Sequence, residues 1–80
     1  MAVVSDAIDV HLPDGGNVVV TFADPEVVDI AGDSVIDTLV HASGGEQDLE
    51  RAVTEAVEDL GLHVRSHATR RPTVLDVRSD

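Results

Sequence analysis

The chain has 80 residues, of which sixteen are acidic and five are basic, and its formal net charge is −11. A chain of this length forms one domain and buries only about 60% of its unfolded surface, which leaves little room for a deep catalytic pocket. The absence of cysteine excludes disulfides and thiolate chemistry. The 42% share of hydrophobic residues excludes a disordered acidic tail, and no apolar run is long enough to span a membrane. We expect a single cytoplasmic domain over 1–80 that has no membrane partner.

The kinds of charged residue carry information about habitat. Eleven of the sixteen acidic residues are Asp. The five residues counted as Lys or Arg are all Arg, and the chain has no Lys. A dense carboxylate surface holds water and cations at high salt, where its own repulsion is screened. The composition resembles that of cytoplasmic proteins from salt-adapted archaea and predicts a halophilic protein. On such a surface carboxylates are abundant whatever the function, so they do not indicate a binding site. The few positive charges are more informative about function.

Residues 7–22 have the alternating pattern of a β-hairpin. The apolar residues of its predicted inner face are Ile8, Val10 and Leu12, and then Val18, Val20 and Phe22. Between them lies a turn-forming segment, 13–17, which contains proline and two glycines. Pairing Leu12 with Val18 places the whole set on one face. Asp24 and Pro25 then end the second strand.

Two helices are predicted in the middle of the chain. Gly32–Ser34 offers a helix N-cap, and the apolar residues after it predict a short helix over 34–42. The preceding residues, 26–30, fit a short strand or an irregular buried stretch. The main helix is predicted over 46–60, because apolar residues from Leu49 onward recur at helical spacing. Helices often end at a residue in the left-handed conformation, which glycine adopts readily, so Gly61 is expected to end this helix.

The pattern returns to alternation after Gly61 and predicts a second hairpin over 62–78. Pairing Leu62 with Val77 aligns the apolar residues on one face. The same register places His63 opposite Asp76 and leaves the basic segment 68–71 as the connecting loop.

The element order β-β-α-α-β-β predicts a small α+β fold. Its four-stranded antiparallel sheet would have one long and one short helix packed on it, with the long helix on one face. The order of the strands across the sheet is left open by the sequence. Three apolar residues do not fit the inner face and are expected on the opposite one: Val19, Val28 and Val74. They predict a second surface that contacts a partner subunit or the short helix.

The second hairpin supplies the candidate binding residues. Arg65, His67, Arg70 and Arg71 lie in the one stretch that has several basic residues and no acid. Guanidinium groups bind phosphates and carboxylates through paired hydrogen bonds, so an anion or an acidic partner is a suitable ligand. The alternative is that arginines of this hairpin neutralise the chain's own carboxylates, with Arg65 and Arg78 pairing to acids across the sheet. The net charge, the lack of an exposed aromatic side chain and the presence of only five Lys or Arg residues argue against an extended nucleic-acid surface.

No metal or cofactor site is predicted. His63 and His67 are four residues apart, which in a strand separates them by about 13 Å, too far to share one ion. His63 and Asp76 form the one pair that the predicted register places side by side. Such a pair suits acid–base chemistry, and it is also an ordinary cross-strand surface pair.

Three classes of function follow from these observations. The first is a non-catalytic protein-interaction or regulatory module that acts as a homodimer, by sheet extension, or as a subunit of a complex. The second is a nucleic-acid or nucleotide-phosphate binder that uses the arginines of the second hairpin. The third is an enzyme with its site at a subunit interface, which the small core and the missing catalytic constellation disfavour.

Overall fold

The computed structural model describes residues 7–67 and 72–79. Its elements follow in the predicted order β-β-α-α-β-β. They are β1 (Ala7–His11), β2 (Asn17–Phe22), α1 (Pro25–His41), α2 (Glu46–Glu58), β3 (His63–His67) and β4 (Thr73–Arg78). The predicted hairpins are therefore present, and the main helix begins at the predicted residue.

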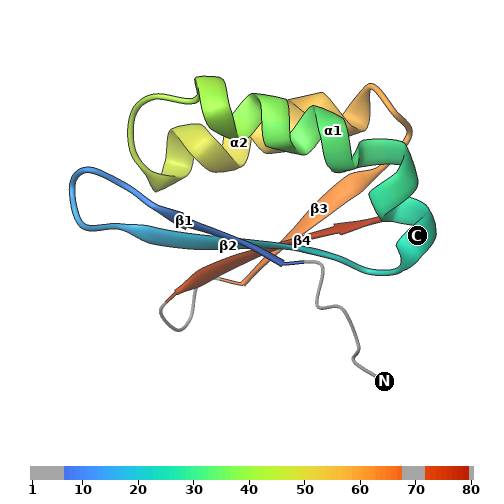
Figure 1. The fold of residues 1–80 in the computed structure, drawn as a ribbon, viewed down its shortest axis with the longest axis horizontal. Helices are drawn as coiled ribbons and strands as arrows, with labels where there is room; N and C mark the ends of the chain where they lie inside the picture. Colours follow the sequence, from blue (N-terminus) through green and yellow to red (C-terminus); the bar gives the residue numbers. More distant parts are fainter. Residues whose placement is uncertain (1–6, 68–71, 80) are drawn as a thin grey trace.

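The structure has two layers, with both helices on the same side of a four-stranded sheet (Figure 1). One apolar cluster fills the space between the layers. Its buried members are Val18, Val20, Val27, Ala31, Val35, Leu49, Val53, Val57, Leu62, Leu75 and Val77. The predicted α+β fold class is confirmed. Among the described residues, no helix has both the length and the apolar composition needed to cross a membrane.

The sheet is mixed, which corrects the antiparallel sheet expected from the sequence. Its strand order is β1-β2-β4-β3, and the central strands β2 and β4 are parallel. Each connection along the chain reverses its direction, and four reversals separate β2 from β4, so these two strands run the same way. They occupy the centre because both are rich in valine, whereas β3 carries charged and polar residues that an edge accommodates.

The first helix corrects a second expectation. Instead of a short helix over 34–42, one continuous helix runs from Pro25 to His41. Asp24 is its N-cap, because the side-chain Oδ1 accepts a hydrogen bond from the Val27 N–H at 3.1 Å. Proline at the first helical position removes an N–H that would have no partner. The buried residues of α1 recur at every fourth position, Val27, Ala31 and Val35. Because these side chains pack on the sheet, the helix continues through Gly32 although glycine is a poor helix former.

Gly32→Ala is expected to stabilise the protein by about 0.5–1 kcal/mol, because glycine is a poor helix former. A methyl group at this position would meet Val28 Cγ1 at 3.5 Å, an ordinary contact. Urea unfolding monitored by circular dichroism measures the change. Gly61→Ala is the control and should destabilise, since Gly61 has a φ of +80° that L residues rarely adopt. A loss of stability in Gly32→Ala would contradict the continuous helix.

The register of the first hairpin differs from the expected one by two residues, since Val18 lies opposite Val10 and not Leu12. The cause is the turn. Gly15 has a φ of +94°, and its N–H donates to the Leu12 carbonyl at 3.0 Å, while the Leu12 N–H donates to the Gly16 carbonyl at 2.8 Å. The loop is therefore 13–15, tighter than the predicted 13–17. A shift by two keeps every side chain on its expected face.

Candidate functional site

No described element covers the face of the sheet opposite the helices (Figure 1). The residues on it are Ala7, Asp9 and His11 of β1, Asn17, Val19 and Thr21 of β2, Val74, Asp76 and Arg78 of β4, and His63, Arg65 and His67 of β3. Val19 and Val74 are neighbours in its centre and are half-buried, as expected for leftover apolar positions. Val28, the third leftover residue, lies instead on α1.

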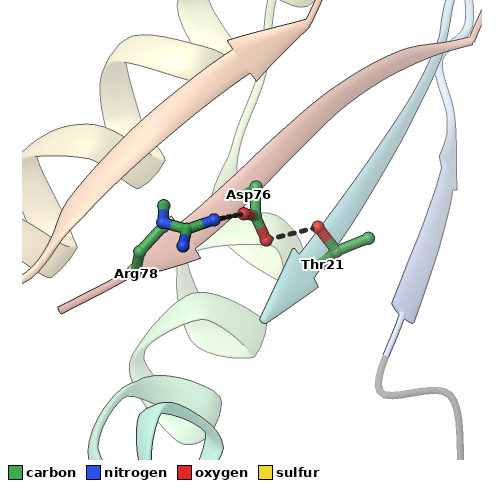
Figure 2. A network of polar contacts seen from close by, with 3 residues as sticks. All are labelled: Thr21, Asp76 and Arg78. Carbon is green, nitrogen blue, oxygen red and sulfur yellow. Dashed lines mark hydrogen bonds and ion pairs between the residues drawn. The ribbon is translucent and has the colours of Figure 1, made fainter. Parts of the chain in front are cut away.

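A polar network joins the two central strands on this face (Figure 2). The Thr21 hydroxyl donates to Asp76 Oδ1 at 2.8 Å, and Arg78 Nη1 donates to Asp76 Oδ2 at 2.8 Å. The Asp76 and Arg78 side chains are 17% and 27% exposed, so the ion pair is partly shielded from water. Both carboxylate oxygens of Asp76 are therefore occupied by partners on β2 and β4.

Thr21→Val is expected to cost about 1.5–3 kcal/mol, since a hydrogen bond to a charged acceptor is lost while the shape is preserved. The free energy of unfolding measures the effect. Thr54→Val is the matched control, because its hydroxyl donates at 2.7 Å to a carbonyl within α2 and serves no second element. Equal effects in the two variants would show that the link between β2 and β4 adds nothing.

The candidate anion-binding residues are only partly described. Arg65 and His67 lie on the uncovered face of β3, and both are exposed. Arg65 lies directly opposite Asp76, whose two oxygens already have partners, and no ion pair involves Arg65 within residues 7–67 and 72–79. The register thus places Arg65 opposite an acid across the sheet, as the alternative expected, whereas Arg78 forms its ion pair with Asp76 of its own strand. Arg70 and Arg71 lie outside the described residues.

The predicted cross-strand pair of His63 and Asp76 is wrong. His63 lies opposite Arg78, and Arg65 lies opposite Asp76, because the register of β3 on β4 also differs from the expected one by two residues. His63 and Asp76 are diagonal neighbours on one face. The partners of Asp76 are Thr21 and Arg78, so it does not orient His63 for acid–base chemistry.

An apolar groove lies along β1, at the edge where no described strand pairs with it. Its lining includes Ile8 and Val10 of the strand and Ile36, Leu39 and Val40 of α1. Ile36 and Val40 are 51% and 72% exposed, which is a high exposure for large aliphatic side chains. The sequence pattern missed this surface, because a short helix over 34–42 would have assigned these residues to the core.

The free edge of β3 has a different character. Its described residues alternate between His63, Arg65 and His67 on the uncovered face and Val64 and Ser66 on the other. A charged residue in the middle of an edge strand discourages pairing with another strand. Each edge strand has such a residue, Asp9 in β1 and Arg65 in β3, so the two edges differ in their surroundings: β1 is bordered by the exposed aliphatic side chains of Ile36 and Val40.

A hollow at the start of α2 is lined by acidic residues. Asp14, Glu46 and Asp48 lie there with the glycines of two loops. The Thr73 hydroxyl donates to Glu46 Oε1 at 3.0 Å, and Asp48 Oδ2 accepts from the Gly45 N–H at 3.4 Å, so both side chains serve the fold. Within the described part of the chain, no group of three His, Asp or Glu side chains is placed to hold a metal ion.

Comparison of the chain with family models, with curated proteins and with solved structures gave no match.

Proposed function

We propose that this chain is a non-catalytic protein-interaction module that self-associates by extending its sheet at β1. The observation that carries the proposal is the pair of exposed aliphatic side chains, Ile36 and Val40, beside a strand edge that no described element covers. An exposed edge strand offers unpaired backbone groups to another strand. A second copy that binds there brings its own α1 alongside, and the aliphatic side chains of the two helices then cover one another.

Symmetry supports self-association over a one-sided contact. An antiparallel pairing of two β1 strands relates the copies by a two-fold axis, so the same surface is used twice and the assembly closes as a dimer. Both edge strands carry a charged residue in the middle, Asp9 in β1 and Arg65 in β3, so like charges alone do not favour one edge. The aliphatic border that Ile36 and Val40 give to β1 is what favours pairing there.

The mass in solution tests the proposal. Light scattering in multi-molar KCl is expected to give about twice the mass of one chain. Replacing Ile36 and Val40 together by Asp should return the mass to that of one chain. Complete burial of one aliphatic side chain stabilises by about 1.5–3 kcal/mol, and each 1.4 kcal/mol is a tenfold change in affinity.

Leu60→Asp is the matched control, since Leu60 is 39% exposed but lies outside the groove, beyond the end of α2. This variant should remain a dimer. A wild-type protein with the mass of one chain at micromolar to millimolar concentration would exclude self-association. A dimer that is unaffected by Ile36→Asp and Val40→Asp would move the interface to another surface.

A second candidate function is binding of a nucleotide phosphate by the second hairpin. It is favoured by the lack of an ion-pair partner for Arg65 within the described residues, since guanidinium groups bind phosphate oxygens in pairs. Calorimetric titration with ATP, at a KCl concentration that keeps the protein folded, tests it. Arg65→Gln should weaken binding, whereas Arg51→Gln on the exposed side of α2 should not. Absence of heat with the wild-type protein at two well-separated temperatures would exclude this function, because a binding enthalpy that is zero at one of them changes with temperature.

A further inference from the structure

The hydrogen bonds of the first turn determine which backbone groups of β1 face its free edge. The Leu12 N–H donates to Gly16, and the Leu12 carbonyl accepts from Gly15, so both groups of Leu12 point toward β2. In an antiparallel ladder this direction alternates from residue to residue. Val10 therefore also turns its backbone toward β2, and its neighbours Asp9 and His11 direct theirs to the open edge.

This alternation limits how a second β1 can pair. The residues that direct their backbone groups outward must lie opposite one another, because only they can exchange hydrogen bonds across the new edge. One such register places Asp9 opposite the second copy's Asp9, which sets two carboxylates against each other. The next register places Asp9 opposite the second copy's His11. A further shift would pair Asp9 with Pro13, which has no N–H to donate. A shift in the other direction would pair Asp9 with Ala7, which offers the carboxylate no polar side chain.

We infer that two copies pair their β1 strands antiparallel about a two-fold axis at Val10, so that Asp9 of each copy lies opposite His11 of the other. This inference rests on the proposed self-association and adds its register. Within one chain, His11 Nε2 already lies 3.4 Å from Asp9 Oδ2, on the uncovered face. The dimer therefore brings two carboxylates and two imidazoles together, and each carboxylate gains a second potential donor.

The inner side of the same register is apolar. The Val10 side chains of the two copies meet at the axis, and Ile8 of each copy lies opposite Leu12 of the other. Ile36 and Val40 border this line of contact in each copy, because they line the groove that Ile8 and Val10 share. In this register the contacts between the copies are polar on one face of the sheet, where carboxylates meet imidazoles. On the other face they are formed by aliphatic side chains.

Single-cysteine cross-linking tests the register directly, since the wild-type chain has no cysteine of its own. At the axis, the two Val10 residues would form a non-hydrogen-bonded pair with Cα atoms about 4.5 Å apart, within the range that a disulfide spans. Val10→Cys is therefore expected to give mostly disulfide-linked dimer under mild oxidation. Asp9→Cys should cross-link at least tenfold more slowly, because its diagonal separation of about 7–8 Å is too long.

Two further cysteine variants serve as controls. Val19→Cys lies on the inner strand β2 and Arg65→Cys lies on the opposite edge, so neither should cross-link faster than Asp9→Cys. If Asp9→Cys or Arg65→Cys links faster than Val10→Cys while light scattering still shows a dimer, the register is overturned and self-association stands. If the wild-type protein has the mass of one chain, the proposed function itself fails.

A charge exchange provides a second test that needs no cysteine. His11→Asp places four carboxylates at the axis and should weaken dimerisation at least tenfold. Combining His11→Asp with Asp9→His restores an acid opposite an imidazole and should recover most of the lost affinity. Failure of the combined variant to recover, in a protein whose circular dichroism is unchanged, would contradict the pairing of Asp9 with His11.

Discussion

Leu75→Ala is expected to destabilise the protein by about 2–5 kcal/mol, the range measured when a buried leucine is truncated. Leu75 has no exposed surface and lies at the centre of β4, with Val20 on one side and Ser66 on the other. The rigid sheet below and two helices above prevent the cavity from collapsing. For a chain of this length the total stability is roughly 4–12 kcal/mol, so the variant loses a large part of it.

Urea unfolding at fixed high KCl measures the loss of unfolding free energy. In a separate thermal unfolding experiment, the midpoint temperature should fall by at least about 10 °C. Leu60→Ala is the matched control, because the same truncation at a residue that is 39% exposed removes less buried surface. A cost below about 1 kcal/mol for Leu75→Ala would contradict the central place of β4 in the sheet.

Removal of salt is expected to have a comparably large effect. The screening length is about 3 Å at 1 M and about 30 Å at 0.01 M. The radius of gyration is 11.9 Å, so at low salt every carboxylate of the folded chain interacts with the others, while at high salt only close neighbours do. The net charge of −11 therefore opposes the compact state most strongly in dilute buffer. We expect the urea midpoint to rise steadily with KCl.

Two comparisons separate screening from other effects of salt. Sucrose favours burial without screening charges, so sucrose alone should recover only part of the stability. Asp29→Asn and Asp33→Asn remove two exposed charges of α1 that lie four residues apart, and no ion pair within the described ranges involves either residue. This double variant should need less KCl to reach the same midpoint. An unchanged salt requirement would exclude self-repulsion as the cause.

The sequence predicts the elements of this fold well and their registers poorly, for a physical reason. Side chains of a strand alternate with a period of two, so a register shifted by two residues keeps the same apolar face. Both hairpins differ from expectation by such a shift. In the first hairpin, the decisive information is the left-handed conformation of Gly15, which tightens the turn. Apolar pattern alone does not distinguish Gly15 from Gly16 for that role.

The groove beside β1 was not predicted from the sequence, because the predicted first helix began at the wrong residue. A helix that begins at Ser34 makes Ile36 and Val40 part of a broad apolar face. A helix that begins at Pro25 has its inward stripe fixed by Val27, Ala31 and Val35, and the same two residues then fall on its flank. The Asp24–Pro25 sequence carried the signal, because aspartate before proline is a favourable N-cap and first helical position.

The parallel pairing of β2 and β4 has a consequence for the order of folding. Each hairpin joins residues that are near in sequence, whereas Thr21 and Asp76 are 55 positions apart. Closing the longer loop costs more chain entropy, and such non-local contacts slow folding. The docking of one hairpin on the other is then the slow step. The Gly15 turn is formed before that step, so substitutions in it will slow folding and leave the unfolding rate nearly unchanged. The seam between β2 and β4 is completed during and after the slow step, so substitutions along it will also hasten unfolding. One sheet thus contains a part that sets how fast the fold is reached and a part that sets how long it lasts.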